Sequence, residues 1–188
     1  MSVTREHLHT RAVEFNGYKR SDGLWDIEAE MRDFRHYDTI VAEKDLLPAG
    51  SSVHRMAITV TIDDAFSVRS ISARLKDAPF RVCSEVEGSL QAMVGATMGS
   101  GWRRAVNHRL GGTKSCTHLR ELLFNMATAA FQTIPTYHAQ ARRQAGLGMD
   151  SITQPPYYLG QCRSWRLDGP VVMRHLPQFH RRDVEHDD

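Results

Sequence analysis

Apolar and charged residues alternate in the first third of the chain. Between residues 24 and 34, four apolar residues of one parity alternate with four charged residues of the other: Trp25, Ile27, Ala29 and Met31 against Asp26, Glu28, Glu30 and Arg32. Alternation with a period of two is typical of a strand with one buried face. The pattern therefore predicts a half-buried β-strand over 24–34.

The same alternation returns at His54, where the apolar parity consists of Met56, Ile58, Val60 and Ile62. Asp63-Asp64 is a turn signal, and residues 68–75 are again rich in β-branched side chains. We expect a β-hairpin over residues 54–75, preceded by a loop over 42–53.

The middle of the chain changes to helical spacing. Helices are predicted over 82–98, 102–110 and 117–132, with glycines between them and Pro135 ending the last one. The third helix has an apolar stripe at i, i+3, i+4, i+7 and i+11: Leu119, Leu122, Leu123, Met126 and Ala130. Near the C-terminus, Asp168-Gly169 separates Cys162–Leu167 from Val171–His175, which predicts a closing β-hairpin.

These elements predict an α+β fold, with antiparallel strands from the N-terminal half and a C-terminal hairpin packed on about three helices. The expected organisation is a flexible arm over residues 1–10, a single α+β domain over 11–178, and a disordered polar tail over 179–188. A chain of 188 residues is long enough to bury a core of this size.

Composition narrows the classes of partner. The net charge is +2, with no basic block, which argues against nucleic acid, since phosphate binding needs clustered positive charge. No apolar run approaches the length of a membrane span. Three widely spaced cysteines, Cys83, Cys116 and Cys162, favour free thiols in a cytoplasmic protein. The expected partner is a small-molecule substrate, and a homodimer is left open.

The strongest candidate for chemistry is GGTKSCTHLRELLFNMATAAF, residues 111–131. Cys116 and His118 fall in the first turn of the third predicted helix, where unpaired N–H groups lower the pKa of a thiol. Residues two apart on a helix do not face each other, so a direct dyad requires Cys116 to precede the helix. Otherwise both need a partner from elsewhere, and His54 and Cys83 are the best candidates. The structural alternative is a buried cysteine beside a capping histidine.

Other candidates are weaker. Arg55 faces the acidic parity of the first strand, where it would form a binding clamp or a plain cross-strand ion pair. Four aromatic and arginine side chains would suit the binding of an aromatic or acyl-type ligand: Tyr18, Trp25, Trp102 and Arg103. Each of them also fits a place in the core or on a solvated surface. A metal set is the alternative use of the thiols and imidazoles: His54, Cys83, Cys116 and His118. Common nucleotide-binding, serine-hydrolase and zinc-protease motifs are absent from the sequence.

Several segments together resemble an uncharacterised bacterial family, domain of unknown function 2889. They are HTRAVEFNGYKRSDGLWDIEAEMRD, HRMAITVTIDD, VGATMGSGWRRAVNHRLGG, CTHLRELLFNMATAAFQT and the closing Cys162 with Gly169-Pro170-Val171-Val172. The resemblance runs from about Thr10 to Pro177. It implies a setting in bacterial catabolism of aromatic or acyl-CoA compounds and names no reaction.

The order of elements is also similar to that of NifU/IscU-type iron–sulfur scaffold proteins. A hairpin is followed by Cys83 before one helix and by Cys116 at the start of another. That resemblance implies a site for zinc or an iron–sulfur cluster held by three cysteines. This chain departs from the pattern, because APFRVCS stands where a Gly-Cys pair is expected and a middle cysteine is missing.

Three functions follow as hypotheses. The first is a small cofactor-independent enzyme, of lyase or hydratase type, that uses acid–base chemistry on an aromatic or acyl-type molecule. Its catalytic residues would be Cys116, His118 and His54. The alternatives are a metal- or iron–sulfur-binding accessory protein and a ligand-binding module without catalysis.

Overall fold

The structure, a computed structural model, describes residues 2–181. Its contacts divide the chain into two compact units, Met1–Thr136 and Tyr137–Asp188. The expectation of one domain over 11–178 stays a prediction.

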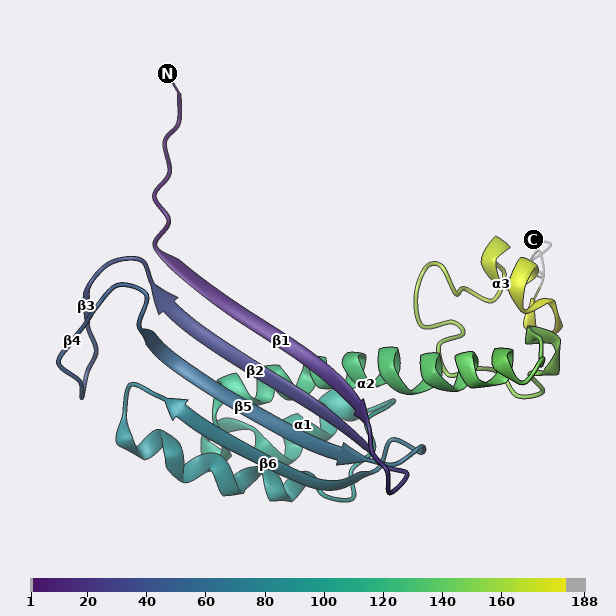
Figure 1. Cartoon of the computed structure of the whole chain (residues 1–188), viewed down its shortest axis with the longest axis horizontal. Helices are drawn as coiled ribbons and strands as arrows, with labels where there is room; N and C mark the ends of the chain where they lie inside the picture. Colours follow the sequence, from purple (N-terminus) through teal and green to yellow (C-terminus); the bar gives the residue numbers. More distant parts are fainter. Residues whose placement is uncertain (1, 182–188) are drawn as a thin grey trace, which may run out of the picture. The chain divides into compact units, whose positions relative to one another are not determined.

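The first unit is built on a four-stranded antiparallel sheet with the order β1-β2-β5-β6 (Figure 1). Its strands are β1 (His9–Lys19), β2 (Trp25–Arg35), β5 (Ser52–Ile62) and β6 (Val68–Asp77). The predicted first strand and the 54–75 hairpin are confirmed as β2 and as β5 with β6. The apolar parity of β2 and β5 is buried, as alternation requires.

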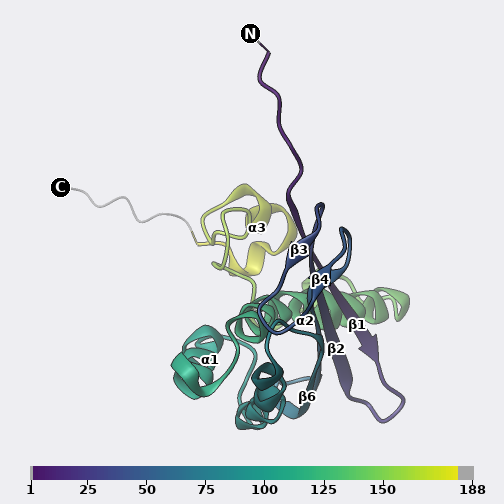
Figure 2. The same ribbon diagram turned by 90° about the vertical axis from the view of Figure 1, so that its left-hand side faces the viewer.

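The structure corrects the expectations for two N-terminal segments. The arm ends before His9, because β1 begins there and pairs along its length with β2. The predicted loop over 42–53 contains β4 (Leu46–Leu47), which forms a small hairpin with β3 (Thr39–Ile40). This hairpin lies beyond the end of the main sheet at which β1 begins (Figures 1 and 2).

A helical layer covers one face of the sheet. It consists of the 3₁₀ helix η1 (Arg81–Met93), α1 (Trp102–Leu110), the short η2 (Gly112–Lys114) and α2 (Thr117–Gln144). Apolar side chains of this layer join the inner face of the sheet in one core, including Leu90, Met93, Val106, Leu119, Leu123 and Met126. The expected α+β class and its three helices are therefore confirmed, with the first helix shorter and more tightly wound than predicted.

Pro135 does not end α2, which continues to Gln144. Proline removes one N–H from a helix and kinks it, but the loss is local. The preceding turn is held by a hydrogen bond from the Thr133 hydroxyl to the Ala129 carbonyl (2.9 Å), and Ile134 is buried. Packing around Pro135 therefore outweighs the missing hydrogen bond.

The predicted C-terminal hairpin is wrong. Residues 162–169 form turns, and α3 (Pro170–His175) stands where the second strand was expected. Pro170 occupies the first turn of this helix, where its fixed φ and missing N–H are favourable. The short helices η3 (Met149–Ser151) and η4 (Pro177–Phe179) complete the second unit.

A small apolar cluster holds the second unit together. Its buried members are Ile152, Leu159, Val172 and Leu176. Phe179 packs against this cluster, so the expected tail at 179–188 begins with an ordered residue. The rest of that tail, from 182 onward, lies outside the described residues. Over 2–181, no helix combines the length and apolar character needed to span a membrane.

β1 and α2 approach closely at Gly17. A Cβ added there would lie 2.6 Å from Cγ2 and 2.8 Å from Cβ of Thr133. No flexible side-chain end can absorb a clash with a Cβ atom, so the strand or the helix must move. Glycine at this position therefore lets α2 lie directly against β1.

We predict that Gly17→Ala lowers the free energy of unfolding by about 1–3 kcal/mol, the usual cost of overpacking. Urea unfolding measures the loss. Gly88→Ala is the matched control, because a Cβ at Gly88 has no neighbour within 4 Å. Adding Thr133→Ala to Gly17→Ala should restore part of the stability. Equal stability of Gly17→Ala and the control would contradict the close approach.

Candidate functional site

Polar residues interrupt the apolar parity of three neighbouring strands at one end of the sheet. Asp33 follows Met31 in the buried register of β2, and His54 precedes Met56 in that of β5. Arg11 lies opposite Asp33 on β1, and Asp33 lies opposite His54 on β5. Because directly paired residues project from the same face of a sheet, the three form a cross-strand row under the helical layer.

Asp33 is the centre of this row. Its side chain is only 6% exposed and accepts hydrogen bonds from Arg11 Nε to Oδ1 (2.8 Å) and from Arg11 Nη2 to Oδ2 (2.9 Å). Its carboxylate also lies 3.2 Å from His9 Nε2 and 3.3 Å from His54 Nδ1. Burial by itself would raise the pKa of Asp33, but the Arg11 guanidinium together with the neighbouring His54 and His9 outweighs burial and holds that pKa below its usual range.

The beginning of α2 brings a thiol and a second imidazole to the row. Cys116 immediately precedes Thr117, the first residue of α2, and its carbonyl accepts the first helical hydrogen bond from Arg120 N (3.1 Å). Its Sγ lies 3.7 Å from His118 Nδ1. Cys116 is therefore a capping residue outside the helix, and this position allows a Cys–His contact that two residues within a helix could not make.

The surroundings bring the pKa values of the Cys116 thiol and the His118 imidazole closer together. Burial raises the pKa of the Cys116 thiol, but contacts with His118 and with the backbone N–H groups of Leu119 and His118 lower it overall. The pKa of His118 is raised, because its contact with Cys116 outweighs partial burial. A thiolate is the reactive form of cysteine, so this arrangement suits Cys116 to nucleophilic or acid–base chemistry.

His54 lies between the Asp33 carboxylate and the Cys116–His118 pair. Its ring centroid lies 4.4 Å from that of His118, and its side chain is 21% exposed. Burial, followed by the neighbouring His118 charge, lowers the pKa of His54 despite the opposing effect of Asp33. The structure thus brings together Cys116, His118 and His54, which we name with Asp33 the sheet-end cluster.

The sheet-end cluster also has donors suited to a metal. One ligand atom each from Asp33, His54 and His118 lies within 4.8 Å of the others. Cys83 is not a member of this group in the described part of the chain; it lies in η1 as a half-buried free thiol. This group shares His54 and His118 with the predicted metal set of His54, Cys83, Cys116 and His118, and it contains Asp33 but neither of the two cysteines.

The predicted substrate-binding residues do not join the cluster. Trp25 and Trp102 belong to the core, where their indole N–H groups bond Asp64 Oδ1 (2.9 Å) and the Leu123 carbonyl (2.7 Å). The Arg103 guanidinium lies over Phe124, 4.2 Å from the ring centroid. Tyr18 is largely exposed near the far end of β1. The structure thus places these four residues away from the cluster, and their role in substrate binding stays a prediction.

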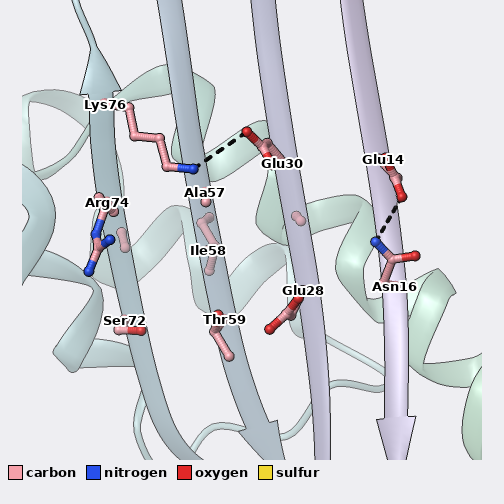
Figure 3. A pocket seen from close by; sticks show the side chains of 12 residues that line it. Glu14, Asn16, Glu28, Glu30, Ala57, Ile58, Thr59, Ser72, Arg74 and Lys76 are labelled. Carbon is pink, nitrogen blue, oxygen red and sulfur yellow. Dashed lines mark hydrogen bonds and ion pairs between the residues drawn. The ribbon is translucent and has the colours of Figure 1, made fainter.

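Arg55 lies on the outer face of the sheet, opposite in parity to His54. Its Nε bonds Glu30 Oε1 (2.8 Å), and Lys76 Nζ lies 3.7 Å from the same oxygen. Glu30 and Lys76 belong to a shallow hollow of about 420 Å³ lined mainly by polar and charged side chains (Figure 3). Such a face is typical of an antiparallel sheet with one side in water.

Asp33, Arg11 and His9 are not among the site residues predicted from the sequence. The signal that marks Asp33 is its parity, because it is an acidic residue in phase with four apolar ones. A charge in a buried register requires a partner, and Arg11 has the matching parity on β1. His9 has the same parity but is half exposed, so no burial signal would have found it.

Fold and site together define an α+β protein with a thiol–imidazole–carboxylate cluster at one end of an antiparallel sheet. Residues 9–132 match the family described as Protein of unknown function (DUF2889), and the chain belongs to that family. The match includes every residue of the sheet-end cluster. Neither the curated proteins nor the solved structures contain a match to this chain. The similarity to iron–sulfur scaffold proteins thus has no support from these comparisons.

We predict that Arg11→Met lowers the free energy of unfolding by about 1–3 kcal/mol at neutral pH, because it leaves a buried carboxylate without its main partner. The lowered pKa of Asp33 adds stability above its unfolded pKa of about 3.9. That contribution is lost as the pH falls through the folded pKa. The difference between wild type and Arg11→Met should therefore shrink in acid.

Urea unfolding at a series of pH values measures this difference. Arg69→Met is the control: Arg69 is an exposed residue of β6 that pairs with Asp63 at the surface, where ion pairs contribute at most about 1 kcal/mol. An Arg11→Met effect that is no larger than the control, or that does not depend on pH, would contradict the role given to Asp33.

Proposed function

We propose that this protein is a small enzyme that transfers protons to and from an aromatic or acyl-type molecule with its own side chains. The observation that carries the proposal is the convergence of two imidazoles, with centroids 4.4 Å apart, each in contact with a different polar partner. His54 contacts the Asp33 carboxylate, and His118 contacts the Cys116 thiol. Paired proton donors and acceptors in one site are the requirement of general acid–base catalysis.

The two contacts suggest different roles for the histidines. A buried carboxylate beside an imidazole orients the ring and favours its acting as a base, which is the arrangement of catalytic triads. His54, beside Asp33, is accordingly the proposed base. The Cys116–His118 pair is the proposed proton donor, since a thiol in contact with an imidazole can share its proton.

Lyase or hydratase chemistry fits this set, because removal of a proton next to a carbonyl and protonation of a leaving hydroxyl need only a base and an acid. All groups required for these steps belong to the chain, so the proposal needs no cofactor. We place the enzyme in the cytoplasm as part of the proposal, since Cys83, Cys116 and Cys162 are all free thiols.

Solvent-deuterium exchange tests this proposal without knowledge of the product. Metal-free protein is incubated in D₂O with a panel of alkyl and aryl acyl-thioesters, and mass spectrometry measures deuterium on the carbon next to the carbonyl. We expect incorporation from at least one member. His54→Gln should slow it by about 10²–10⁴-fold, the usual contribution of a general base.

Two further variants complete the test. Cys116→Ala should slow turnover of the same substrate, whereas Cys83→Ser, a thiol outside the cluster, should retain the wild-type rate. No incorporation from any member of the panel, or equal rates for His54→Gln and Cys83→Ser, would overturn the proposal.

A further inference from the structure

The sheet-end cluster has a second capacity that goes beyond the proposed function. We propose that Asp33, His54 and His118 form a binding site for a divalent transition-metal ion of the zinc class. The three side chains come from β2, β5 and the start of α2, and their ligand atoms all lie within 4.8 Å of one another. Although the site overlaps the proposed acid–base centre, metal binding does not depend on that activity.

The spacing of the donors fits a tetrahedral ion. With bonds of about 2.0–2.2 Å to nitrogen and oxygen, two ligands of tetrahedral zinc lie about 3.3–3.6 Å apart. Asp33 Oδ2 and His54 Nδ1 are already 3.3 Å apart. The widest pair must close by up to about 1.5 Å, and rotations of the histidine side chains can supply that movement.

The chemistry of the donor set selects the class of ion. Two imidazoles and one carboxylate suit zinc and iron(II), whereas calcium and magnesium prefer oxygen ligands alone. Three protein ligands leave a fourth position open, as in catalytic zinc sites. Cys116 supplies a single thiol beside this donor set, whereas an iron–sulfur cluster is usually held by four cysteine ligands.

Neighbouring groups act as an outer shell for these ligands. Arg11 bonds both oxygens of Asp33 and fixes the plane of the carboxylate. His9 also contacts Oδ1, so the lone pair available to an ion is the second one of Oδ2, the oxygen that lies beside His54. Cys116 contacts Nδ1 of His118. This contact leaves the other ring nitrogen, Nε2, as the atom that would bind the ion. Hydrogen-bonded outer partners of this kind are a regular feature of metal sites.

An exposed pair of histidines at the same end of the sheet serves as a comparison. His7 and His36 stack with centroids 3.9 Å apart, and both contact the Thr10 hydroxyl. The pair has no carboxylate among these contacts. A substitution at His36 thus separates binding at the sheet-end cluster from unspecific binding to surface imidazoles.

Metal binding is tested on full-length protein stripped with a chelator. Zn²⁺ affinity is measured at about pH 7.5 by competition with a chromophoric chelator, and Co²⁺ absorption reports the coordination geometry. We expect one Zn²⁺ per chain and a tetrahedral or five-coordinate Co²⁺ spectrum. His54→Gln and His118→Gln should each weaken Zn²⁺ binding by more than about 100-fold, and Cys116→Ser by about 10–100-fold.

His36→Gln should leave the affinity unchanged. If the stripped protein binds no Zn²⁺, or if His36→Gln weakens binding as much as His54→Gln, the site is wrong. Circular dichroism first establishes that each variant is folded. If His54→Gln on β5 does not fold, His118→Gln at the partly exposed start of α2 provides the test of the site. Because the assay contains no substrate, its failure leaves the deuterium-exchange test of the proposed function intact.

Discussion

A buried carboxylate in the apolar register of a β-sheet is the constraint on which this structure depends. Asp33 occupies a position that alternation assigns to the core, where an unpaired charge is strongly unfavourable. Arg11 satisfies both of its oxygens from the neighbouring strand. The pairing of β1 with β2 therefore has an electrostatic as well as a hydrophobic reason for its register, because a slip by one residue would separate the two charges.

The same strand determines where α2 lies. Arg11 bonds Glu121 Oε2 (3.0 Å) near the start of the helix, and Gly17 contacts Thr133 further along it. These two attachments orient α2 along β1, so that the first turn of the helix lies at the end of the sheet that carries Asp33. His118 and Cys116 meet His54 as a consequence. The site is thus a product of the same packing that forms the core.

Sequence patterns identified the parts of the fold that depend on local periodicity. The strands β2 and β5 and the helix α1 follow from their apolar spacing, which neighbouring residues alone determine. β1 was not predicted, because its inner face combines Arg11 and Gly17 with few apolar residues and so lacks a clear alternation. The prediction of a C-terminal hairpin was wrong because Asp168-Gly169 can equally precede a helix that begins with Pro170.

The candidate site was predictable to the extent that its residues are close in sequence. Cys116 and His118 were found from the helix start, and His54 was among the expected partners. Asp33 and Arg11 were not, since their importance arises from strand register, which connects residues far apart in the chain. Cys83 was chosen for its chemistry, and a thiol carries no information about which helix face it occupies.

The central claim is that His54 and His118 meet at the end of the sheet. Nuclear Overhauser spectroscopy on metal-free protein with isotope-labelled histidine tests it most directly. The structure requires cross-peaks between the ring protons of His54 and His118, in addition to those between His118 and Cys116. A spectrum with clear His118–Cys116 cross-peaks and none between the two rings would contradict the account.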